Sequence, residues 1–211
     1  VGGSGPVDFV PRWSAHSQLL PYLELGAVFH SLNFSFIPWV HHAQYGAPNR
    51  TALSTRVTMF LCPSDPDSIA EEFGLAHNHY RACAGTRPYN LKMDSPDGTG
   101  RNDGAFWFQS AVRPADVVDG TTSTAIFSER CLGTPGRSDF RADYYLSRAD
   151  ESACAAASPA TAPRHVSPQE WSGQRWGDGN VMYTRYHHIL PPNSPSCNFG
   201  GEDFDGQVLV S

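Results

Sequence analysis

The sequence predicts an α+β fold, in which short N-terminal helices pack on an antiparallel sheet built from later segments. Apolar residues in the first third recur at helical spacing, as Leu53, Val57 and Phe60 do. From about residue 78 the period changes to short β-type runs bounded by Gly, Asp and Asn. The 211 residues also include 19 glycines and 17 prolines, which favour short elements joined by many turns.

Three segments of the first third predict helix. Residues 13–24 carry Ser14 as a capping residue, and Pro21 inside the segment predicts either two short turns or one kinked helix. Residues 27–34 and 50–61 are the second and third amphipathic segments.

Later segments predict strands and loops. Short β-type runs occupy residues 79–83, 104–108 and 123–128. Residues 94–104 form a polar, Gly-rich loop between the first two runs, and residues 113–120 form a turn that ends in Asp-Gly. The sheet is therefore expected to be small and rich in connections.

Composition predicts one globular domain over residues 1–211, with the Ala-, Ser- and Pro-rich segment 146–170 as a surface excursion. A hydrophobic fraction of 40% supports a packed interior. The net charge of −6 argues against nucleic acid and anionic membrane surfaces, which select basic patches. No apolar run reaches the roughly 18 residues that span a bilayer.

The five cysteines are widely spaced, which suits an oxidising compartment. Cys62 and Cys83 each lie beside a turn, and a disulfide between them would contribute about 3 kcal/mol; the alternative is two buried free thiols. A second predicted disulfide joins Cys154 to Cys197, both on loops. Cys131 is then the odd thiol.

The 94–104 loop predicts a calcium site. Asp94, Asp97, Asn102 and Asp103 place oxygen-bearing side chains close together, and intervening glycines let the backbone wrap. Calcium takes six to eight oxygen ligands, some of which can be backbone carbonyls. The alternative is a solvated acidic turn balanced by neighbouring basic residues.

Two other site hypotheses rest on histidines and tryptophans. His77 and His79 would share one face of a strand and could ligate a transition metal, or they could be ordinary polar histidines. Trp107, Trp171 and Trp176 could bind carbohydrate by stacking, or they could belong to the core.

No complete catalytic constellation is visible, so the sequence predicts a protein that is not an enzyme. There is no GxSxG elbow and no phosphate-binding loop. Cys83 could pair with a histidine as a thiolate, but a disulfide is the more economical use of that residue. A secreted hydrolase remains the alternative, because any two of the 21 acidic residues could converge.

A series of short motifs runs through nearly the whole chain. In order they are LLPYLE (19–24), NFS (33–35), FLCPSD (60–65), HYRACAGT (79–86), DG.F (103–106), VVDGTTSTAIFSE (117–129), W..G...Y..YHHILPPN (from 176) and SC (196–197). Together they resemble the large bacterial family of prepilin-like proteins of unknown function that is expanded in planctomycetes. Such proteins typically start with a prepilin segment and a long hydrophobic helix and end in a His-Pro-Gly-Gly-Val-Asn stretch and a final strand. Because this chain shows neither end, we expect it to be the globular middle part of a longer precursor.

The resemblance implies export and a pseudopilin-like α+β head that lacks its hydrophobic helix. The expected function is a non-catalytic structural subunit of a pilus-like, pseudopilus-like or cell-surface fibre assembly, located outside the cell. Its partners would be further copies or other pilin-like subunits. The missing hydrophobic helix would be its only membrane anchor. Calcium occurs in the pseudopilin heads that the family resembles, which supports the loop site. The alternatives are an extracellular carbohydrate-binding module and a secreted hydrolase.

Overall fold

The computed structural model describes residues 12–38, 47–65, 74–87, 101–133, 144–146, 156, 164–165, 172–181, 183–194 and 197–198. Its helices are α1 (Ala15–Leu19), α2 (Gly26–Ser31) and α3 (Arg50–Leu53), with the 3₁₀ turns η1 (Leu20–Leu23), η2 (Ala47–Asn49), η3 (Thr58–Phe60) and η5 (Pro114–Asp116). Its strands are β1 (Tyr80–Gly85), β2 (Phe127–Glu129), β3 (Tyr144–Leu146), β4 (Arg164–His165), β5 (Arg185–His187) and β6 (Cys197–Asn198).

The strands form two three-stranded sheets, in the orders β2-β1-β5 and β4-β3-β6. In the first sheet β1 pairs with β2 antiparallel and with β5 parallel, so this sheet is mixed. The second sheet is mixed in the same way. The α+β class is thus confirmed, whereas the expectation of a purely antiparallel sheet is corrected. Parallel neighbours need a long connection, and residues 86–184 lie between β1 and β5 in the sequence.

The N-terminal helices start and stop where local chemistry dictates. The Ser14 hydroxyl caps α1 by accepting a hydrogen bond from the Ser17 amide at 3.1 Å. Pro21 falls at the start of η1, so the segment forms two short turns, one of the two predicted alternatives. The predicted helix over residues 50–61 is broken: only Arg50–Leu53 is α-helical, and a 3₁₀ turn follows.

The strand predictions are confirmed in part. Residues 80–83 of the 79–83 run fall in β1, and only the end of the 123–128 run enters a strand, β2. Residues 104–108 do not form a strand but a series of bends that folds back on β1. The Gly104 and Phe106 amides donate to the carbonyls of Ala84 and Cys83, at 3.2 and 3.0 Å.

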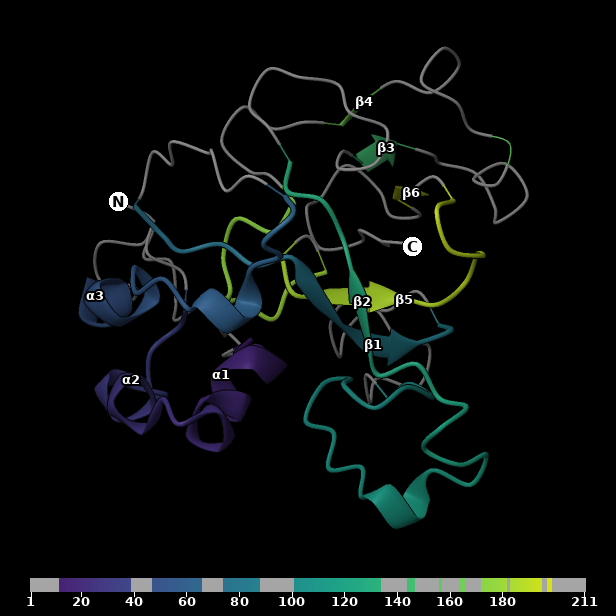
Figure 1. The fold of residues 1–211 in the computed structure, drawn as a ribbon, viewed down its shortest axis with the longest axis horizontal. Helices are drawn as coiled ribbons and strands as arrows, with labels where there is room; N and C mark the ends of the chain where they lie inside the picture. The colour runs from purple at the N-terminus through teal and green to yellow at the C-terminus, as the bar shows by residue number, and fades with distance from the viewer. Residues whose placement is uncertain are drawn as a thin grey trace, which may run out of the picture.

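The main core forms around Trp176 in the segment before β5, and its indole is fully buried. Leu20, Leu53 and Phe60 from the helical third pack in the same cluster. Figure 1 shows α1, α2 and α3 grouped on one side of the molecule, with the β2-β1-β5 sheet beside them. The helices therefore pack around a loop tryptophan as well as beside the sheet. Among the described residues, no helix is long and apolar enough to cross a membrane.

Candidate functional site

The segment Gly177–Asp178–Gly179 lies against the start of the described chain. Trp13 and Asp178 form an isolated antiparallel bridge, and the Gly179 amide donates to the Arg12 carbonyl at 2.6 Å. A β-carbon at Gly179 would lie 2.8 Å from the Trp13 carbonyl oxygen, closer than such atoms approach one another. Glycine at this position is what lets the two backbones come together.

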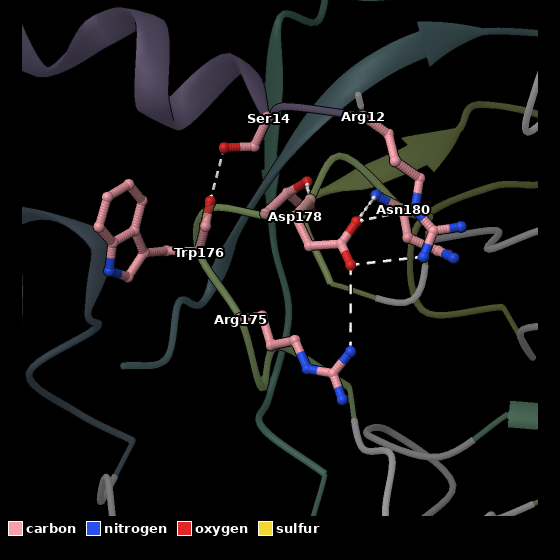
Figure 2. A network of polar contacts seen from close by, with 7 residues as sticks. Arg12, Ser14, Arg175, Trp176, Asp178 and Asn180 are labelled. Carbon is pink, nitrogen blue, oxygen red and sulfur yellow. Dashed lines mark hydrogen bonds and ion pairs between the residues drawn. The ribbon is translucent and has the colours of Figure 1, made fainter. Parts of the chain in front are cut away.

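Asp178 is fully buried and faces two guanidinium groups (Figure 2). Its Oδ1 lies 3.1 Å from Arg12 Nε, and its Oδ2 lies 4.0 Å from Arg175 Nη1. Oδ1 also accepts a hydrogen bond from the Asn180 amide at 3.0 Å. A buried carboxylate needs such partners, because burial of an uncompensated charge is costly. The network fixes the segment that carries Arg12 and Trp13.

A groove of about 450 Å³ opens next to this network. Its walls come from the segment around α1 and η1, from the 106–110 loop, and from Gly179 and Arg185. Aromatic rings dominate the lining: Trp13, Tyr22, Phe106, Trp107 and Phe108. This volume and this mixture of rings with a few polar groups are typical of small-ligand sites.

Two of the rings, Trp13 and Phe106, also contact residues that do not line the groove. The Trp13 indole donates from Nε1 to the Phe36 carbonyl at 3.1 Å, and its ring lies 4.7 Å from that of Phe34. Phe106 packs against Phe127 of β2, with ring centroids 5.2 Å apart. The back of the groove is therefore rigid before any ligand arrives.

The rim of the groove is more open. Tyr22 is 83% exposed although it is aromatic, and Trp107 is half-buried. The exposed Gln109 sits in the left-handed region at φ 57°, a conformation that non-glycine residues rarely adopt. Backbone strain of this kind tends to concentrate at functional sites.

The polar lining consists of amide, hydroxyl and guanidinium groups. Gln18 and Gln109 are exposed, and Arg12 and Arg185 contribute the guanidinium groups. Ser110 is already used, because its hydroxyl donates to the Ala105 carbonyl at 2.9 Å. Within the part of the chain that the structure describes, no acidic side chain lines the groove. The groove thus offers hydrogen-bond donors beside aromatic faces.

The predicted tryptophan site is corrected in part. Trp107 does line the groove, but Trp176 is 0% exposed and donates from Nε1 to the Thr55 carbonyl at 3.1 Å, so it serves the core. Trp171 lies outside the described residues. Sequence reasoning missed Trp13 and Tyr22, which it treated as part of a helical segment and not as ligand contacts.

The predicted Cys62–Cys83 disulfide is not formed in the structure, where both thiols are free. The Cys62 amide donates to His79 Nδ1 at 3.1 Å, which places Cys62 beside His79. Cys83 lies four residues beyond His79, inside β1, so the two cysteines occupy different parts of the fold.

Cys83 instead packs with Tyr183 and Tyr186 in a small second core cluster. Burial raises the pKa of the Cys83 thiol, despite a hydrogen bond with the Tyr186 side chain. Such a thiol is a packing residue and not an activated nucleophile. The predicted Cys154–Cys197 disulfide involves Cys154, which lies outside the described residues, and stays a prediction.

The two described members of the calcium loop close the exit of β1. Asn102 accepts from the Arg87 amide at 3.2 Å and donates to the Arg87 carbonyl at 2.6 Å. Asp103 accepts from the amide and the hydroxyl of Thr86, both at 2.6 Å. Partial burial tends to raise the pKa of Asp103, but these hydrogen bonds hold it below its ordinary value.

Asp94 and Asp97 lie outside the described residues, so the calcium site stays a prediction. Within the described ranges, no cluster of three or more His, Cys, Asp or Glu residues could hold a metal ion. His79, one of the two histidines proposed as metal ligands, is fully buried and contacts an aspartate instead. Its Nε2 lies 3.2 Å from Asp65 Oδ2. Asp65 also accepts from the Leu132 amide at 3.1 Å. His79 and Asp65 therefore connect the FLCPSD and HYRACAGT motifs.

The architecture defines a small α+β fold with an aromatic groove. Residues 2–207 match the family described as "Protein of unknown function (DUF1559)". The chain belongs to this family, which is pilin-like and prepilin-associated. The resemblance to prepilin-like proteins is thereby confirmed at the level of the family. No curated protein and no solved structure gives a significant match to the chain.

Proposed function

We propose that this protein is a non-catalytic structural subunit of an exported pilus-like, pseudopilus-like or cell-surface fibre assembly. The observation that carries the proposal is membership of a prepilin-associated family over residues 2–207. In this proposal the domain is the globular head of a prepilin-like precursor, in a family that is expanded in planctomycetes. Further copies or other pilin-like subunits are its partners.

Two properties of the described residues are compatible with such a head. The turn over residues 113–120 is exposed along most of its length, and Val118 at its tip is 90% exposed. An apolar side chain at that position could contact a neighbouring subunit. The net charge of −6 would keep the remaining surface from non-specific association.

The test is the location of the protein in the cells that produce it. An antibody against the chain should label intact cells, and the antigen should be released by shearing and sediment with surface filaments. A cytosolic enzyme assayed in parallel controls for lysis. Antigen found only with the cytosolic marker would reject the proposal. So would robust turnover of a glycan, ester or peptide by the purified protein that one point substitution abolishes.

Of the two alternative functions, only carbohydrate binding gains an observation from the structure, the aromatic groove. No observation on the described residues favours a secreted hydrolase.

A further inference from the structure

We propose that the groove between α1, η1 and the 106–110 loop is a carbohydrate-binding site, in which a pyranose ring stacks on Trp107 and Tyr22. The site does not depend on the assembly role, because it belongs to a single copy of the chain. Its lining differs from the tryptophan set that the sequence suggested. Only Trp107 is common to both.

The exposure of the rings is the first argument. A tyrosine that is 83% exposed, at the rim of a groove that also contains a half-buried tryptophan, leaves aromatic faces in contact with water. Covering such faces with an apolar partner is favourable, because it removes apolar surface from water. One face of a pyranose ring consists of C–H groups, which suits this contact, while its hydroxyls remain at the edge.

The polar groups provide the second argument. Gln18 and Gln109 are exposed in the lining, and each amide offers two donors and an acceptor. Arg12 presents its guanidinium at the same wall, fixed by Asp178 at 3.1 Å. Sugar hydroxyls both donate and accept, so they can satisfy amides and guanidinium groups alike. A purely apolar partner would take the exposed Gln18 and Gln109 amides out of water without replacing their hydrogen bonds to water, at a cost in free energy.

Preorganisation is the third argument. Trp13 is held by its hydrogen bond to Phe36, and Phe106 is held by the ring of Phe127. The Phe106 amide also donates to the Cys83 carbonyl of β1 at 3.0 Å, which fixes the start of the loop to the sheet. Because Trp13 and Phe106 are already ordered, little conformational entropy is lost from these side chains when a ligand binds.

The ligand can come from a neutral or an acidic glycan, which share the pyranose face. Isothermal titration calorimetry of the purified chain should therefore use cellotetraose, chitotetraose and tetragalacturonate as separate probes. We expect at least one of them to bind. A preference for tetragalacturonate assigns the arginines a direct role, whereas a preference for a neutral probe assigns recognition to the rings and amides.

The variants Trp107→Ala and Tyr22→Ala should each weaken binding of that probe at least tenfold, whereas Trp107→Phe, which keeps a ring, should lose less. Met59→Ala is the control, because Met59 is exposed and does not line the groove. Thermal melts establish that each variant is folded, and Tyr22→Ala serves if Trp107→Ala does not fold, because Tyr22 is mostly exposed. The proposal is overturned if none of the three probes binds, if both alanine variants bind as the wild type does, or if an apolar peptide binds the groove and no oligosaccharide does.

Discussion

The carboxylate of Asp178 and the guanidinium of Arg12 meet at 3.1 Å although 166 positions separate them in the chain. The contact joins the segment before β5 to the segment that leads into α1. The Ser14 amide strengthens the same junction by donating to the Gly177 carbonyl at 3.0 Å, and the Ser14 hydroxyl donates to the Trp176 carbonyl at 2.6 Å. One wall of the aromatic groove therefore depends on a long-range buried ion pair.

Replacing Asp178 with asparagine should destabilise the protein by about 3 kcal/mol, because it removes a buried negative charge from between Arg12 and Arg175. Urea unfolding followed by tryptophan fluorescence measures the loss. Asp116→Asn is the matched control, since Asp116 pairs with Arg113 at 2.9 Å on the surface. Exposed pairs contribute little, so the control should change the midpoint much less. Equal effects for the two variants would contradict the role given to Asp178.

Trp176→Ala should cost about 3–5 kcal/mol, the usual range for truncating a large aromatic in a packed core. The indole is 0% exposed, lies 5.9 Å from the Phe60 ring, and satisfies the Thr55 carbonyl. Trp107→Ala, which removes the same side chain from a half-buried position, is the control and should cost less. A chemical denaturation midpoint that is unaffected by Trp176→Ala would show that the core does not depend on this residue.

The secondary-structure elements that were predicted correctly are those determined by residues within or next to the element itself. Ser14 as a cap and Pro21 as an interruption act within a turn of their own positions, and both have the predicted effect. The strand that begins at Tyr80 likewise follows from the short β-type run over residues 79–83. Residues 104–108 have a similar pattern, but their amides bond back to the end of β1 and they bend instead.

The groove could not be predicted from the sequence, because it depends on contacts between segments that are far apart in the chain. Nothing near Trp176 in the sequence indicates that Gly177 and Gly179 will let residues 12–14 pack against it and bury the indole. Its burial and the exposure of Tyr22 depend on which distant segments meet, and a pattern of spacing does not carry that information. The same holds for Cys62 and Cys83, because Cys62 lies beside His79 whereas Cys83 packs with Tyr183 and Tyr186.

Two buried histidines predict a loss of stability in mild acid. Burial, with the charge of Arg81 as a second cause, lowers the pKa of His16 from 6.5 to about 3. Burial and the charge of Arg185 lower the pKa of His187 to about 3 as well. Below pH 6.5 the unfolded chain takes up these protons and the folded chain does not. Stability is therefore fully present above pH 6.5 and falls as the pH decreases toward 3, by up to about 1.4 kcal/mol per pH unit for each histidine.

His16→Phe isolates the first of these contributions. The imidazole lies between the rings of Phe60 and Phe127, at 4.8 and 5.7 Å, so an aromatic replacement suits the site. Between about pH 7 and about pH 5 the variant should lose about 2 kcal/mol less than the wild type, as measured by urea unfolding at each pH. His30→Phe, which alters an exposed histidine of α2, is the control and should keep the wild-type slope. An unchanged slope in His16→Phe would refute the assignment.

The 94–104 loop predicts that calcium stabilises the protein. Asn102 and Asp103 are already oriented by Arg87 and Thr86 at the exit of β1, so two of the four proposed oxygen donors are fixed in place. Gly85, at φ 120°, packs so closely on these two side chains that a β-carbon there would overlap them, which keeps Asn102 and Asp103 close to the strand. Calcium at about 100-fold over its Kd should add about 2.7 kcal/mol and raise the melting temperature, and a chelator should reverse the effect.

Asp97→Asn should abolish the calcium-dependent shift, because it removes one of the proposed carboxylate ligands. Asp119→Asn, in the exposed turn before β2, is the matched control and should keep the shift. Melts of the wild type that coincide in calcium and in chelator would mean that Asn102 and Asp103 serve only to close the loop on β1. In that case the acidic residues form a solvated turn.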